Sequence, residues 1–236
     1  MKLGILQCDS VLDEYQQQFD DYPQMFMRLF RAIQPDLEFE IFHVKHGQFP
    51  QTLNQCDAYI STGSRDSVYD NLAWLPPFKD FILALHQHNI KLVGVCFAHQ
   101  FIADIFGGKT ERSHKGWGIG VATNQVVKKM PWMQPVLDSY RVIVSHQDQV
   151  IRLPKNATLL ASSEFCPNFM FQIGNNIITI QGHPEFSKSY SETLMLHRAE
   201  KIGEPTCQNG LASLKLTTDE TIIAKWILNF VSMGGI

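Results

Sequence analysis

The chain lacks an excess of charge of either sign and lacks a long apolar run. Its 236 residues carry a formal net charge of −3, and 18% of them are charged. Such a balance gives no electrostatic reason to expect binding to nucleic acid or to an anionic membrane surface. No apolar stretch approaches the roughly 20 residues of a membrane-spanning helix, and the apolar start at residues 1–9 is too short for a signal peptide. These absences predict a cytoplasmic protein with an ordinary soluble surface.

The chain contains few cysteines, and their spacing does not indicate disulfide pairs. The five cysteines are widely scattered and include no C-x-x-C pair: Cys8, Cys56, Cys96, Cys166 and Cys207. This spacing argues against a disulfide framework and against a zinc knuckle, and it favours a reducing compartment. The chain also has no P-loop and no dinucleotide fingerprint. We therefore predict neither a metal site nor a cofactor, and we expect four of the thiols to pack as small apolar side chains.

Apolar segments rich in β-branched residues recur along the chain and predict strands at 3–8, 37–44, 58–61, 91–96, 142–144, 158–161, 169–173 and 177–180. Helical patterns lie between the early ones, at 22–33, 75–88 and 98–106. Strands and helices alternate up to about residue 106, which indicates βαβ units and a parallel sheet. From residue 118 to 180 the strands follow one another with short turns, which indicates a smaller antiparallel or mixed layer. Two helices, near 187–202 and 219–231, are expected to close a single domain over 1–236.

The segment G-V-C-F-A-H-Q at 94–100 places a cysteine between a buried strand and a helix. Small residues on either side, Gly94 and Ala98, suit a sharp turn that lifts Cys96 above the sheet edge. The N-terminus of the helix favours a thiolate, and the backbone N–H of Phe97 could donate to an oxyanion. Taken alone, a cysteine at a strand end is also consistent with a buried structural thiol.

The segment Q-G-H-P-E-F at 181–186 follows another buried strand, where active sites of open α/β sheets gather. His183 is the candidate general base, and Glu185 is the candidate that orients it. Pro184 is expected to push His183 toward extended geometry, in which residues i and i+2 point the same way. In isolation the segment is more typical of a core histidine and a surface acid, and it is the cysteine segment upstream that favours the catalytic interpretation.

Together the two segments resemble those of the class I glutamine amidotransferases, and the likeness runs from residue 3 to about residue 200. Stretches at 60–64, 115–118, 145–148 and 161–163 are similar to those of stand-alone proteins resembling the glutaminase domain of GMP synthase. The resemblance implies a flavodoxin-like α/β fold with an open, mostly parallel central sheet flanked by helices. It also implies a reaction in which Cys96 attacks the side-chain amide of glutamine, with His183 as base and Glu185 as its partner.

The resemblance further implies roles for residues outside the Cys-His-Glu triad. The backbone N–H groups of Gly63 and Phe97 match the oxyanion hole of the family. Gln100 matches a residue that helps to hold the substrate glutamine, and Ser145 and His146 match a segment that grips its α-amino and carboxylate ends. Two departures stand beside these matches. Alanine replaces the usual glycine at position 98, and T-G-S at 62–64 replaces Gly-Gly-Pro or Asn-Gly-Pro.

Several functions remain open at this level. The chain could be a glutaminase that feeds ammonia to a separate synthetase or acceptor subunit, since it contains no nucleotide motif of its own. It could instead be a free-standing hydrolase of γ-glutamyl peptides, which a larger pocket would favour. A non-catalytic binding or regulatory protein of the same fold is a third alternative, and a redox-active thiol protein is a fourth. The intact Cys96, His183 and Glu185 speak against the third.

Overall fold

The structure is a computed structural model that describes residues 1–233. Its centre is a nine-stranded sheet with the order β2-β1-β3-β4-β11-β10-β9-β6-β7. The first-half strands are β1 (Lys2–Leu6), β2 (Glu38–Phe42), β3 (Ala58–Ser61) and β4 (Lys91–Val95). The second-half strands are β6 (Gly118–Val126), β7 (Ser139–His146), β9 (Ala157–Ser162), β10 (Met170–Ile173) and β11 (Ile177–Ile180). A separate two-stranded antiparallel ladder joins β5 (Lys109–Arg112) to β8 (Asp148–Arg152).

The sheet changes from parallel to antiparallel at β11. Strands β2, β1, β3, β4 and β11 pair in parallel, whereas β11, β10, β9, β6 and β7 pair antiparallel. Because β11 pairs in parallel with β4, the two strands end at the same edge of the sheet. The predicted flavodoxin-like α/β fold is confirmed. The antiparallel strands of the second half extend this same sheet, and β5 and β8 supply the smaller layer.

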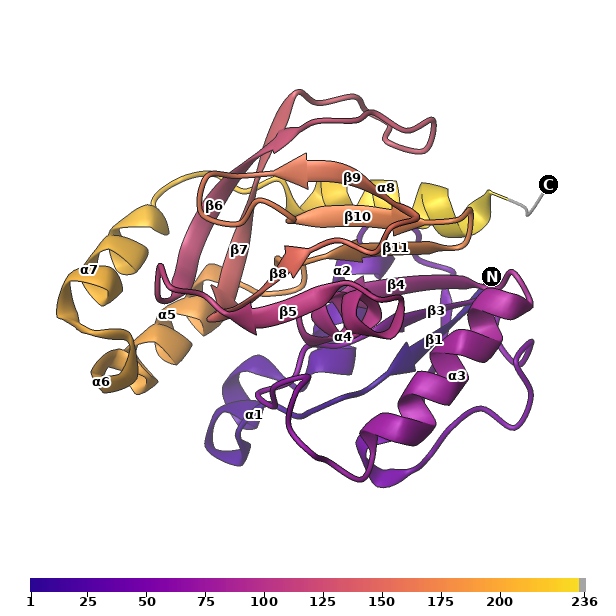
Figure 1. The fold of residues 1–236 in the computed structure, drawn as a ribbon. Helices are drawn as coiled ribbons and strands as arrows, with labels where there is room; N and C mark the ends of the chain where they lie inside the picture. The colour runs from indigo at the N-terminus through magenta and orange to yellow at the C-terminus, as the bar shows by residue number, and fades with distance from the viewer. Residues whose placement is uncertain (234–236) are drawn as a thin grey trace.

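Helices cover both faces of the sheet (Figure 1). The helices are α1 (Asp13–Phe19), α2 (Tyr22–Arg31), α3 (Leu75–Gln87), α4 (Phe97–Ile105), α5 (Lys188–His197), α6 (Ala199–Ile202), α7 (Glu204–Ser213) and α8 (Glu220–Ser232), with a 3₁₀ turn at η1 (Val44–His46). Phe26 of α2 and Trp226 of α8 belong to one core cluster, and Phe78 of α3 and Ile102 of α4 belong to another. Central strands covered on both faces read as continuous apolar runs, which is why the sequence reveals them clearly.

The prediction of only two closing helices is wrong. The segment expected as one helix at 187–202 is divided into α5 and α6, and an additional helix, α7, follows. The sequence of α7 contains Gly210 in its interior, which lowers helix propensity, whereas Pro205 stands in the first turn, where proline is tolerated. Gly210 is needed for packing, because a Cβ there would lie 2.7 Å from the Cδ1 atom of Ile119 in β6.

The three short helices α5, α6 and α7 lie beside the ends of β6 and β7 (Figure 1). This α5–α7 segment separates β11 from α8 in the chain. Within residues 1–233, no helix combines the length and the apolar character that crossing a bilayer requires.

Candidate active site

Cys96 occupies a strained turn between β4 and α4. Its φ of 50° and ψ of −99° lie in a region that L-residues rarely adopt. Its backbone N–H donates to the carbonyl of Ile180 at 2.9 Å, which ties the turn to the end of β11. The backbone passes closely here, since a Cβ on Gly94 would lie 3.2 Å from the backbone of Ala98. The turn therefore presents the thiol at the edge of the sheet while most of the residue stays buried.

His183 lies just beyond β11, beside the same edge. Its backbone N–H donates to the carbonyl of Ile143 at 2.8 Å, forming an isolated bridge to β7. The ring stacks on Phe186 with centroids 4.0 Å apart. Its Nδ1 atom is 2.7 Å from Oε1 of Glu185, whose side chain is fully buried. The imidazole is therefore held on one face by an aromatic ring and at one nitrogen by a carboxylate.

The expected extended geometry does not continue past His183, which forms the bridge to Ile143. Pro184 and Glu185 form a turn, and the N–H of Phe186 donates back to the carbonyl of His183 at 3.4 Å. The turn folds the carboxylate back toward Nδ1, so the pair meets by chain reversal rather than by side chains on one face of a strand.

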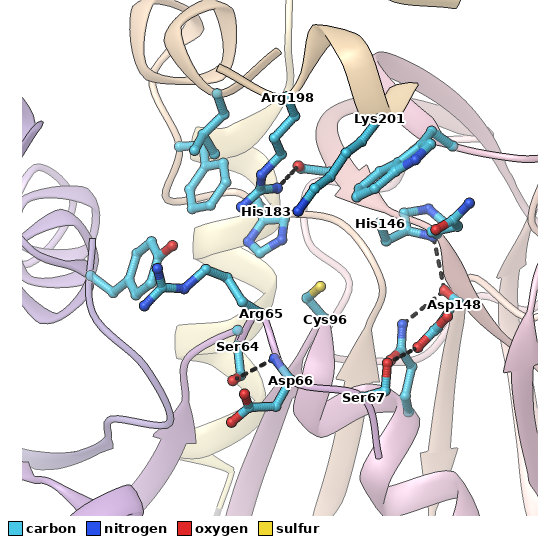
Figure 2. Close-up of a pocket in the computed structure, with 18 of the residues that line it drawn as sticks. Ser64, Arg65, Asp66, Ser67, Cys96, His146, Asp148, His183, Arg198 and Lys201 are labelled. Atoms are coloured by element: carbon cyan, nitrogen blue, oxygen red, sulfur yellow. Dashed lines mark hydrogen bonds between the residues drawn. The ribbon is translucent and has the colours of Figure 1, made fainter. Parts of the chain in front are cut away.

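Gly63, which follows β3, lies between Cys96 and His183. A Cβ built on Gly63 would be 2.9 Å from Cε1 of His183 and 3.5 Å from Cβ of Cys96. The thiol and the imidazole therefore face a common space (Figure 2). Thr62 donates its hydroxyl to the carbonyl of Gly63 at 3.0 Å, which fixes the peptide that follows this glycine. Phe97 opens α4, where a backbone N–H has no intrahelical acceptor.

Electrostatics at His183 favour the protonated ring. Burial alone would lower its pKa, but the Glu185 carboxylate and the sulfur of Cys96 outweigh burial and raise the pKa of His183. An imidazolium between a carboxylate and a sulfur is the charge arrangement that a thiolate nucleophile requires.

One glutamine side chain adjoins the sulfur, and a second glutamine holds the first in place. Gln181 is fully buried, and its Nε2 atom lies 3.6 Å from Sγ of Cys96. Gln100, in the first turns of α4, donates from Nε2 to Oε1 of Gln181 at 3.1 Å and to the carbonyl of Asp148 at 2.8 Å. Gln100 is thus buried and not solvated. Gln181 was part of the motif, but sequence reasoning assigned it no role.

The predicted substrate residues at the end of β7 also reach the site. His146 is buried, and its Nδ1 atom is 3.0 Å from the carbonyl of Asp148. Burial lowers the pKa of His146 to about 4, so its ring is neutral near pH 7. Ser145 accepts a hydrogen bond from Nη1 of Arg198 at 3.1 Å.

A pocket of about 490 Å³ opens over Cys96 and brings the predicted residues together (Figure 2). All of the site residues named from the sequence line it except Phe97 and Glu185, of which Glu185 lies behind His183. Asp148, Arg198 and Lys201 also line it, and sequence reasoning missed them. Asp148 stood within the quoted 145–148 stretch, whereas no motif marks the two basic residues. Among the described residues, no cluster of His, Cys, Asp and Glu is arranged to hold a metal ion.

Two kinds of known protein are similar in sequence to this chain. The chain is 32% identical over 194 residues to gamma-glutamyl peptidase 3 of Arabidopsis thaliana, an alignment that covers 79% of this chain and 76% of that one. It is 36% identical over 108 residues to a subunit of the glutamine-hydrolysing GMP synthase of Methanosphaera stadtmanae, covering 45% and 56% of the two chains.

A crystal structure of a glutamine amidotransferase from Thermotoga maritima superposes with a TM-score of 0.77 at 19% identity, covering 98% of this chain and 97% of that one, and shows the shared fold. The sequence profile of the family described as "Glutamine amidotransferase class-I" matches residues 20–201. The resemblance carried by the two motifs is confirmed: the chain belongs to the class I glutamine amidotransferase family and is an enzyme of that type.

Proposed function

We propose that this enzyme hydrolyses the γ-amide bond of glutamine or of a γ-glutamyl compound through a thioester on Cys96. The observation that supports this most strongly is the line formed by Cys96, His183 and Glu185 at one edge of the sheet. In this line the sulfur is the nucleophile, the imidazole transfers the proton, and the carboxylate holds the ring and stabilises its charge.

The first half of the reaction forms the acyl-enzyme. The thiolate of Cys96 attacks the γ-carbonyl carbon, and the carbonyl oxygen becomes an oxyanion that the N–H groups of Gly63 and Phe97 would stabilise. The imidazolium of His183 gives its proton to the leaving nitrogen, the C–N bond breaks, and ammonia or an amine departs. The sulfur now holds the γ-glutamyl group as a thioester.

The second half releases glutamate. Neutral His183 takes a proton from water, the hydroxide attacks the thioester carbon, and the C–S bond breaks. The products are glutamate and the original thiolate–imidazolium pair, so no oxidant or cofactor is consumed. Gln181, which points its amide nitrogen at Sγ, would stabilise the thiolate in both halves.

Groups that could hold the glutamyl ends lie on the β7 side of the pocket. We assign Gln100, Ser145 and His146 to this task, as the family resemblance implies. Asp148 adds a carboxylate that accepts hydrogen bonds from Ser67 and Tyr69 and forms no ion pair among the described residues. It is therefore suited to receive the α-ammonium group of the substrate.

The fate of the leaving nitrogen defines two versions of this function. Similarity to one subunit of a GMP synthase supports transfer of ammonia to a separate acceptor protein. Similarity to a γ-glutamyl peptidase over a larger share of the chain supports free hydrolysis of γ-glutamyl peptides. Both versions share the acyl-enzyme on Cys96.

The experiment is an assay of the purified chain with glutamine and γ-glutamyl peptides, measuring ammonia, free amine and glutamate, alongside Cys96→Ser. We expect turnover by the wild type and a loss of at least about 10³-fold in the variant. A diazo-ketone analogue of glutamine should label Cys96 and spare Cys166, because burial raises the pKa of the Cys166 thiol to about 12. Turnover by Cys96→Ser at the wild-type rate, or equal labelling of both thiols, would refute the assignment.

A further inference from the structure

Two cations of the α5–α6 segment enter the pocket without a counter-ion. Arg198 lies between α5 and α6, and Lys201 lies one turn further along. Arg198 donates to the neutral hydroxyl of Ser145, and neither basic residue forms an ion pair among residues 1–233. An unpaired pair of cations beside an active site is a ready receptor for a carboxylate.

Two other charged residues that line the pocket, Arg65 and Asp66, already form ion pairs within the protein. Arg65 is paired with Asp9 through two contacts of 2.9 and 3.1 Å, and Asp66 lies 2.8 Å from Lys45. These two lining residues therefore neutralise partners within the protein. Apart from the Cys96–His183–Glu185 line itself, Asp148, Arg198 and Lys201 are left as charged lining residues that form no ion pair among residues 1–233.

The two candidate substrates, glutamine and a γ-glutamyl amino acid, differ in the number of their carboxylates. Glutamine has one ammonium and one carboxylate, and its leaving group is uncharged ammonia. A γ-glutamyl amino acid has one ammonium and two carboxylates, of which the second belongs to the leaving amine. The carboxylate of an amino-acid leaving group would give Arg198 and Lys201 a counter-ion that the leaving ammonia of glutamine cannot supply.

The two cations lie on the side where the leaving group departs. Figure 2 shows Arg198 and Lys201 extending from the α5–α6 segment toward His183. In the proposed reaction His183 protonates the leaving nitrogen, so a carboxylate attached to that nitrogen would meet these side chains.

We infer that Arg198 and Lys201 form a subsite for the carboxylate of an amino-acid leaving group, and that the enzyme selects γ-glutamyl amino acids or peptides over glutamine and over γ-glutamyl alkylamides. This inference rests on the proposed function and names its substrate class. Residues of the α5–α6 segment would then determine which substrates the pocket prefers.

The test compares two donors that differ only in the carboxylate: γ-glutamyl-alanine and γ-glutamyl-ethylamide. We expect the wild type to favour γ-glutamyl-alanine by at least about tenfold in kcat/KM, as charge-assisted hydrogen bonds allow. The double variant Arg198→Gln/Lys201→Gln should lose most of this ratio, mainly through KM for γ-glutamyl-alanine. Arg198→Lys/Lys201→Arg, which keeps both charges, should retain a clear preference.

Lys225→Gln, on the exposed side of α8, is the matched control and should keep the wild-type ratio. A wild type that treats the two donors alike would overturn the inference without any variant. An equal fall for both donors in the double variant would also overturn it, since that result would place the cations on the α-carboxylate of the glutamyl group. If the wild type turned over neither glutamine nor any γ-glutamyl donor, the proposed function itself would be refuted.

Discussion

The amide nitrogen of Gln181 lies 3.6 Å from the sulfur of Cys96, and the Gln181 side chain is fully buried. Gln100 fixes the orientation of this amide, because its own Nε2 donates to the Gln181 oxygen. The nitrogen of Gln181 is therefore the end that faces Sγ. A buried N–H donor beside sulfur stabilises the thiolate over the thiol.

Gln181→Met should slow alkylation of Cys96 by iodoacetamide by about tenfold at pH 7, because the variant keeps the volume and loses the donor. Peptide mass spectrometry of the modified cysteine gives the rate. Gln172→Met is the matched control: Gln172 is also buried, but it donates to the carbonyl of Gly174, away from the site. A Gln181→Met rate equal to that of the control would show that the amide does not support the thiolate.

Glu185→Gln should reduce kcat for a γ-glutamyl donor by about 10²-fold or more while the fold persists. The variant keeps the size of the side chain but removes the negative charge 2.7 Å from Nδ1 of His183. Since burial otherwise lowers the pKa of His183, loss of this charge should lower the histidine pKa, which NMR titration of the ring would detect. Glu192→Gln, at an exposed position of α5, serves as control. An unchanged kcat would remove Glu185 from the mechanism.

Gly63→Ala should lower kcat by more than about tenfold with little change in melting temperature, because the new Cβ would lie 2.9 Å from Cε1 of His183 and displace the ring. Gly107→Ala tests the opposite case. Gly107 has a φ of 85° and nothing within 4 Å of a built Cβ, so its substitution should cost about 1 kcal/mol of stability and no activity per folded molecule. Similar activity losses in both variants would contradict a specific role for the space at Gly63.

The parallel half of the fold and the Cys and His positions could be predicted from the sequence because they depend on local signals. Strands such as β4 and β11 are apolar throughout, and active sites gather where such strands end. The contact between Glu185 and His183 was predicted, but the turn that produces it was not, since the residue types at 183–186 do not determine that turn. The contact of Gln181 with Sγ of Cys96 could not be predicted either, because the residue type alone does not indicate which group an amide after a strand will contact.

The α5–α7 segment marks the limit of sequence reasoning. Arg198 and Lys201 stand in a polar helical stretch that reads as a solvated surface. Only the packing of α7 against β6, with Gly210 close to Ile119, turns these helices toward the pocket. Contacts between segments about 90 residues apart decide which face of a helix is functional, and local composition does not encode them.

His99 makes the stability of the enzyme sensitive to acid. The residue is fully buried beneath the site, with Nδ1 2.8 Å from the hydroxyl of Thr179 and Nε2 without a partner among the described residues. Burial, with a smaller contribution from His146, lowers the pKa of His99 from 6.5 to about 3. Between these values the unfolded chain binds a proton that the folded chain does not, so stability falls as the pH falls.

From pH 7 to pH 5, His99 alone should remove about 2 kcal/mol from the free energy of unfolding. Urea denaturation at the two pH values measures this, and the loss should be smaller by about that amount in His99→Gln, whose side chain does not titrate. Exposed His114 provides the control, because His114→Gln should keep the wild-type dependence on pH. If His99→Gln lost as much stability as the wild type over the same interval, His99 would be charged in the folded protein or accessible to water, and the acid sensitivity would originate elsewhere.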